Sequence, residues 1–123
     1  MMKKILIIDE SNFSQICSAI LEAEGHKTKI LKDVKGLLSK LNDEFGLIIT
    51  SYPFGFLFFE EIKKRNIPLI VLTDHINKHL VNILQGISNS YCMVKPLDYQ
   101  KFRSLVKTIV SCDTSLAGGY KIF

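Results

Sequence analysis

Short apolar runs recur along the chain, and a small polar or acidic group follows each of them. The clearest run is Leu47-Ile48-Ile49, which is followed by Thr50 and Ser51. Comparable runs cover residues 5–8 and 69–72. Runs without a polar break are apolar on both faces and are typical of central strands in a parallel sheet. Pro53 prevents the middle run from continuing as a regular ladder strand.

Amphipathic segments with helical spacing lie between these runs. In the first segment, the i, i+3, i+4, i+7 spacing predicts that Ile16, Ala19, Ile20 and Ala23 form the buried face, with Gly25 as the C-terminal stop. Helices are also predicted around the apolar sets Val34, Leu37, Leu38 and Leu41, then Ile76, Leu80, Ile83, Leu84 and Ile87, and finally Phe102, Leu105, Val106 and Ile109, where Asp98 is the expected N-cap. An aromatic-rich helix is predicted over residues 54–65.

Strands and helices therefore alternate five times. The strands are expected near residues 3–9, 26–31, 46–51, 69–73 and 90–94, and the second is the weakest and most polar. Short right-handed crossovers then give one α/β domain, a parallel five-stranded sheet covered by helices on both faces. We expect this domain to span residues 1–111 and residues 112–123 to be a C-terminal tail or linker.

The composition fits one ordinary globular domain. The chain has 123 residues, of which 47% are apolar and 23% are charged, so it can bury a substantial core. No apolar run approaches the ~20 residues that span a bilayer, and the run at 5–8 is too short for a signal peptide. We therefore expect a cytoplasmic protein without membrane contact.

Charge and cysteine content exclude two further classes. The net charge is +4, and the lysines are spread over most predicted helices, which argues against a nucleic-acid-binding surface. The three cysteines, Cys17, Cys92 and Cys112, have no CxxC spacing. They indicate reduced, mostly buried thiols and not a disulfide framework or a zinc site.

Parallel strands all end at the same edge of a sheet, so the residues after them converge. Three stretches that reach this edge, Lys4–Glu10, Ile67–Thr73 and Tyr91–Leu97, resemble the receiver domain of bacterial two-component response regulators. The resemblance covers about residues 3–110. It implies a CheY-like, flavodoxin-like (βα)5 three-layer sandwich with strand order 2-1-3-4-5, and a role in phosphorelay signal transduction.

The resemblance also assigns roles to single residues. Asp9 and Glu10 match the acidic pair that holds Mg²⁺. Thr73 and Lys95 match the phosphoryl-contact positions, and Pro96 matches a cis proline. Cys92 stands at the position of the switch aromatic, with Tyr91 displaced by one.

Ser51 occupies the phosphoacceptor position, where the family has an aspartate. A serine needs a general base to attack phosphorus, and its phosphate is a stable ester. Losing one carboxylate also weakens the expected Mg²⁺ site. We therefore expect no aspartyl phosphorylation, at most weak Mg²⁺ binding and no other cofactor. Lys95 is then expected to pair directly with Asp9 or Glu10.

The expected function is phosphorylation-independent signalling by a pseudo-receiver that is not an enzyme. The partner would be a kinase or an output protein, bound at the fourth helix, fifth strand and fifth helix, and a homodimer is an alternative assembly. Cations expected on this face are Lys78, Lys101, Arg103 and Lys107.

Two other functions stay open. One is a working receiver that uses Asp9 or Glu10 as the acceptor and keeps Mg²⁺. The other is a nucleotide- or cofactor-binding module, which the lack of a Gly-rich loop after the first strand disfavours. His75 and His79 have the i, i+4 spacing of metal ligands, but a solvated helix surface is the preferred interpretation.

Overall fold

The computed structural model describes residues 4–8, 13–31, 45–52, 64, 67–87, 89–111 and 120–122. Their elements are, in order, β1 (Lys4–Ile8), α1 (Phe13–Ala23), β2 (Thr28–Leu31), β3 (Phe45–Ser51), β4 (Leu69–Thr73), α4 (Lys78–Gln85), β5 (Ser90–Val94), α5 (Tyr99–Ser111) and β6 (Tyr120–Ile122). The predicted second helix lies outside the described residues, as does the third apart from Lys64. Within the described part of the chain, no helix is long and apolar enough to cross a membrane.

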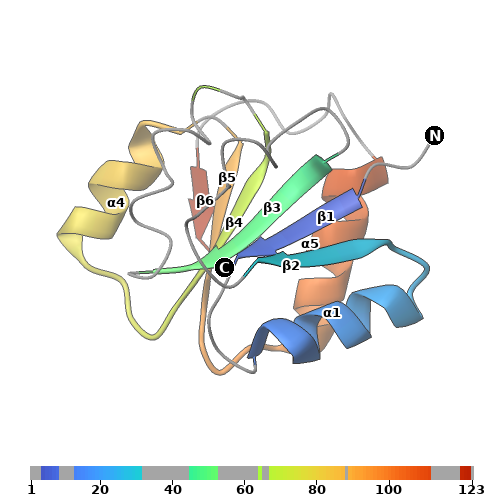
Figure 1. Cartoon of the computed structure of the whole chain (residues 1–123). Coiled ribbons are helices and arrows are strands. Elements are labelled where there is room, and N and C mark those ends of the chain that lie inside the picture. The colour runs from blue at the N-terminus through green and yellow to red at the C-terminus, as the bar shows by residue number, and fades with distance from the viewer. Residues whose placement is uncertain are drawn as a thin grey trace.

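The strands form one parallel sheet in the order β2-β1-β3-β4-β5-β6 (Figure 1). The first five strands have the order 2-1-3-4-5, which confirms the predicted fold. The sixth strand was not predicted. It comes from the segment expected to be a tail or linker, and it places Tyr120, Lys121 and Ile122 beside residues 90–92 of β5.

Helices cover both faces of the sheet, because the central strands are apolar on both sides. On one face, α1 and α5 pack Cys17, Leu21, Phe102 and Val106 against the sheet. On the other face, α4 contributes Leu80 and Leu84. The predicted double burial is confirmed, since every residue of the runs 5–8, 47–49 and 69–72 is at most 2% exposed.

The predicted buried face of α1 is wrong. Ile16 is 47% exposed, and Ala19 and Ala23 are exposed as well. The helix instead buries Ser14, Cys17 and Leu21. The helix carries apolar residues on two sides, so spacing alone could not identify the side that faces the sheet.

The helix ends follow their sequence signals. After α1, Gly25 has φ +93°, and the amides of Gly25 and His26 donate to the carbonyls of Glu22 and Leu21, respectively. This pattern is a Schellman C-cap, and the positive φ favours glycine. Asn77 caps α4 through a 2.8 Å hydrogen bond from the amide of Leu80. The predicted Asp98 cap of α5 is confirmed, because its carboxylate accepts from two backbone amides.

Candidate functional site

The carboxyl ends of β3, β4 and β5 bring three of the predicted site residues to one edge. Ser51 is in register with Leu72, and Thr73 is in register with Val94. Each of these two strand pairs continues by one hydrogen bond beyond its last pair in register. Between β3 and β4, Tyr52 N donates to Leu72 O at 2.9 Å, and between β4 and β5, Lys95 N donates to Thr73 O at 2.7 Å. The three side chains of Ser51, Thr73 and Lys95 therefore start from successive positions along this edge.

The end of β1 lies at the same level as the end of β3. Ile8 is in register with Thr50, whose hydroxyl donates to the Ile8 carbonyl at 2.8 Å. Asp9 and Glu10 come next along the chain, but they lie outside the described residues. The predicted acidic pair, and its predicted contact with Lys95, therefore remain predictions.

The two hydroxyl residues of the site are nearly inaccessible to solvent. Ser51 is 7% exposed and Thr73 is 3% exposed. Thr73 donates its hydroxyl to the backbone oxygen of His75 at 2.7 Å, which fixes the turn that leads towards α4. The third strand thus ends in a buried neutral hydroxyl, where phosphoryl transfer to an aspartate would need a carboxylate.

Lys95 reaches across to the start of α1. Its ammonium nitrogen lies 4.8 Å from the centroid of the Phe13 ring, within the range of a cation–π interaction. Both side chains are half-buried. The peptide bond between Lys95 and Pro96 is cis, and Pro96 itself is exposed.

Cys92 and Tyr91 lie on opposite faces of β5, because successive side chains of a strand alternate. Cys92 packs with the α4 side of the core and Tyr91 with the α1–α5 side. Burial raises the pKa of the Cys92 thiol from its usual 9.0 to about 11 and also raises the pKa of the Tyr91 hydroxyl. Tyr91 therefore cannot supply an aromatic ring on the face that Cys92 occupies.

A contact that the sequence did not indicate joins Tyr52, the residue after β3, to α4. The Tyr52 hydroxyl and Nδ1 of His79 are 2.6 Å apart, and the ring centroids are 5.8 Å apart. His75 and His79 are both exposed, and no group of three potential metal ligands is found among the residues that the structure describes. His79 thus has a structural partner in Tyr52.

Sequence reasoning missed two residues of the site, Phe13 and Tyr52. Each lies within a few residues of a strand end that was identified, so a weak positional signal existed. What each ring contacts depends on long-range packing, which neighbouring residues in the sequence do not encode.

No protein-family model and no curated protein sequence matches the chain. Solved structures do match the chain. A two-component response regulator from Clostridium difficile has a TM-score of 0.79 and 22% identity over 92% of this chain and 99% of that one. The chemotaxis response regulator CheY4 of Vibrio cholerae has a TM-score of 0.73 and 20% identity over 89% of this chain and 99% of that one.

A third similar structure is the beryllofluoride-activated NtrC4 receiver domain dimer, with a TM-score of 0.75 and 23% identity over 89% of this chain and 98% of that one. These structures match the described sheet order and the helices on both of its faces. At such identities the similarity establishes the fold. The chain therefore has the fold of response-regulator receiver domains.

Proposed function

We propose that this chain is a receiver-type signalling module that acts through protein–protein contact, without aspartyl phosphorylation and without enzymatic activity of its own. One observation carries the proposal. Ser51 ends the central strand β3 and is 7% exposed, and it lies at the same sheet edge as Thr73, which ends β4, and Lys95, which follows β5.

The chemistry of a serine at this position opposes the reaction of a receiver. A carboxylate is already ionised near neutral pH and can attack phosphorus without losing a proton. A buried serine hydroxyl must pass its proton to a base as it attacks, and the product would be a stable ester. An acyl phosphate, whose lability makes a receiver signal reversible, cannot form on Ser51.

Mg²⁺ would be held by the carboxylates of Asp9 and Glu10, and when bound it would neutralise charge on a phosphoryl group. Ser51 supplies a neutral oxygen where a third carboxylate would stand, and Mg²⁺ binding depends strongly on anionic oxygen ligands. The ligand set that this sequence offers is therefore a poor fit to a divalent cation.

We propose α4, β5 and α5 as the surface for a kinase or an output protein. Lys78 and Lys101 are exposed on it. Arg103 instead points towards α1, where its Nε lies 3.6 Å from a carboxylate oxygen of Glu24. β6 lies beside β5 at this edge of the sheet (Figure 1), so a partner here would also meet the backbone of β6.

Incubation with acetyl phosphate and Mg²⁺, followed by intact mass spectrometry, tests the phosphorylation part of the proposal. The wild-type chain is expected to gain no labile phosphoryl group. A Ser51→Asp variant restores the carboxylate and is the positive control, while Ser51→Ala is the matched negative control. A labile adduct on the wild-type chain would contradict the proposal.

The same assay distinguishes the proposed function from the alternative of a working receiver. If the wild-type chain gains an adduct that Asp9→Asn or Glu10→Gln abolishes and Ser51→Ala leaves intact, one of the acidic pair is the acceptor. The chain would then be a working receiver with a displaced acceptor.

A further inference from the structure

We propose that β6 can leave β5 of its own chain and pair with β5 of a second copy, so that two copies form a reciprocally strand-swapped dimer. This inference goes beyond the proposed function and does not depend on the chemistry at Ser51. It concerns the parallel pairing of residues 120–122 with residues 90–92, in which Cys92 is in register with Ile122. We call the border of β5 that β6 covers, residues 90–92, the β5 edge.

β6 is held to the rest of the molecule by few contacts. It has three residues, and β5 is the only strand that it pairs with among those the structure describes. Ile122 is 44% exposed and is not among the described residues of either core cluster. Parallel pairing is also slightly less stable per residue than antiparallel pairing. β6 should therefore separate from β5 at a lower free energy than global unfolding requires.

β5 should keep its shape when β6 leaves. Ser90, Tyr91 and Cys92 are at most 3% exposed, and every residue of β5 pairs with β4 on the other side. The Ser90 hydroxyl lies 3.2 Å from Leu84 O and 3.0 Å from Ile87 O, which ties the start of β5 to the end of α4. The β5 edge without β6 is thus a preformed strand with open backbone groups, and such an edge favours the addition of another strand.

A second copy of this chain is the occupant that the register itself supplies. Every copy carries a segment 120–122 that already pairs with residues 90–92, so the swapped form needs no new complementarity. Residues 112–119 link α5 to β6, and a link of this length can extend over at most about 30 Å, the diameter of a small domain. β6 can therefore reach a neighbouring molecule. A reciprocal swap gives a closed dimer with twofold symmetry, which higher protein concentration favours.

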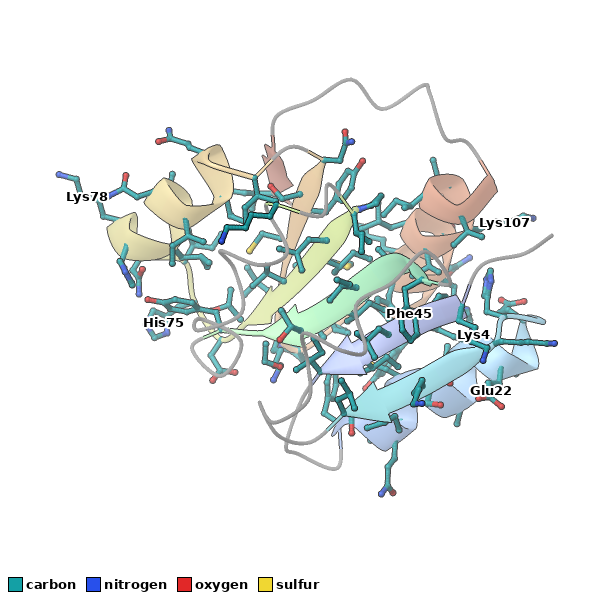
Figure 2. The ribbon with its side chains drawn as sticks, turned by 45° about the horizontal axis from the view of Figure 1, so that its top comes forward. Lys4, Glu22, Phe45, His75, Lys78 and Lys107 are labelled. Atoms are coloured by element: carbon teal, nitrogen blue, oxygen red, sulfur yellow. The ribbon has the colours of Figure 1, made fainter. Side chains whose placement is uncertain are left out.

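The position of β6 allows the swap without any rearrangement of the other strands. β6 lies at the border of the sheet opposite β2, so only its pairing with β5 has to change partner. Figure 2 shows β6 beside β5, with α4, which carries Lys78, and α5, which carries Lys107, to either side. The strand order 2-1-3-4-5 and the two core clusters stay within each copy.

Backbone alternation identifies the amide that reports on β6. Successive residues of a strand direct their N–H and C=O groups to opposite neighbours. Asn89 O and Lys95 N both bind backbone groups of β4. Tyr91 and Met93, which are in step with these two residues, therefore also face β4. The Cys92 amide faces β6, and it should lose its partner when β6 leaves.

Hydrogen-exchange NMR of the full chain tests the cover. Tyr91 is in register with Lys121 and faces β4, so Lys121 is the β6 residue whose amide faces β5. Lys121→Pro removes that amide, and the matched control Lys121→Ala keeps it. Lys121→Pro should speed exchange at the Cys92 amide by about two- to tenfold, the range for losing one net hydrogen bond. The Tyr91 and Met93 amides should stay unchanged in both variants, and Lys121→Ala should leave Cys92 protected.

Mixing two proteins tests whether a second copy supplies β6. An isotope-labelled Lys121→Pro chain has an open β5 edge that can still accept a strand. Unlabelled wild-type chain, added in excess at millimolar concentration, should restore slow exchange at the labelled Cys92 amide. Unlabelled Lys121→Pro chain offers no competent β6, so it is the control and should restore nothing. Sedimentation velocity should show a dimer that increases with the concentration of wild-type chain and is depleted in Lys121→Pro.

The strand swap is overturned if Lys121→Pro leaves exchange at Cys92 unchanged, if wild-type chain restores no protection, or if the unlabelled control restores it equally. Should Lys121→Pro fail to fold, a mixture of labelled and unlabelled wild-type chains takes its place. An intermolecular nuclear Overhauser effect is then expected between the Cys92 amide of one chain and the Ile122 methyl groups of another. Its absence at millimolar concentration would equally overturn the swap.

Discussion

The hydroxyl of Tyr52 and Nδ1 of His79 share a hydrogen bond of 2.6 Å, which joins the residue after Ser51 to the first turn of α4. Tyr52 packs on the α4 side of the sheet, against the core cluster that contains Leu80 and Leu84. The position of α4 is thus coupled to the end of β3 by a side-chain contact that does not involve Ser51.

Removing this hydrogen bond should lower the free energy of unfolding by a small but measurable amount. We expect Tyr52→Phe to lower the free energy of unfolding by about 0.5–1 kcal/mol, because the pair is partly solvated and a net protein hydrogen bond contributes about that amount. Urea unfolding of Tyr52→Phe, His79→Ala and the double variant gives the coupling energy. His75→Ala is the control and should be nearly neutral. Additive effects of the two substitutions would show that the bond contributes nothing.

The corrected face of α1 predicts opposite outcomes for two leucine-sized side chains on one helix. Leu21 is fully buried, so Leu21→Ala should lower the free energy of unfolding by about 2–5 kcal/mol through lost burial and a residual cavity. Ile16 is 47% exposed, and Ile16→Ala should change it by about 0.5 kcal/mol or less. Chemical denaturation measures both. If Ile16→Ala proves the more damaging substitution, the face predicted from spacing is restored.

The cap of α5 should be replaceable by any side chain with an oxygen acceptor. The Asp98 carboxylate accepts from the amides of Gln100 at 3.0 Å and Lys101 at 3.1 Å. Asp98→Ala should lower the free energy of unfolding by about 1 kcal/mol, while Asp98→Asn should keep most of the stability that the cap contributes. Thermal unfolding by circular dichroism distinguishes them. Equal losses in the two variants would mean that charge, and not capping geometry, is responsible.

Stability should decline at alkaline pH because of Cys92. Burial raises the pKa of its thiol from 9.0 to about 11, so the folded chain keeps the proton to higher pH than the unfolded chain does. The contribution is complete below pH 9 and is lost as the pH rises through about 11. The free energy of unfolding should fall by about 2–3 kcal/mol in total, which is the difference between a thiol pKa of 9.0 and one of about 11, and Tyr91, whose pKa is also raised, acts in the same direction.

Urea unfolding at several pH values between 8 and 11 measures this decline. A Cys92→Ala variant should have a shallower dependence on pH than the wild-type chain, whatever its stability at neutral pH. Lysine deprotonation affects both proteins alike, so the difference between the two slopes reports the thiol. Parallel slopes would mean that Cys92 has a similar pKa in both states.

The sequence predicted the parts of the fold that follow from uninterrupted apolarity. The runs at 5–8, 47–49 and 69–72 have no polar residue that could face solvent, so each could only be a buried central strand. α4 and α5 were predicted because each has a single apolar stripe beside strongly polar residues, but Ile76, which was expected on the buried face of α4, precedes the helix and is 37% exposed. In α1, both Ile16 and Leu21 lie on apolar stripes, and only the packed sheet decides between them.

Strand β6 was missed for a different reason. Three residues after Gly118-Gly119 have too little pattern to indicate a strand, and their conformation depends on pairing with residues 90–92 of β5. The site shows the same limit. Backbone register brings Ser51, Thr73 and Lys95 together and could be anticipated from topology, whereas the partners of Lys95 and Tyr52 depend on side-chain directions that only tertiary packing sets.

β6 turns β5 into an interior strand over residues 90–92. Backbone groups there that would otherwise be open to another chain are already satisfied from within the molecule. Exchanging the tripeptide 120–122 would therefore alter what an approaching protein meets along that border, where Ile122 is 44% exposed.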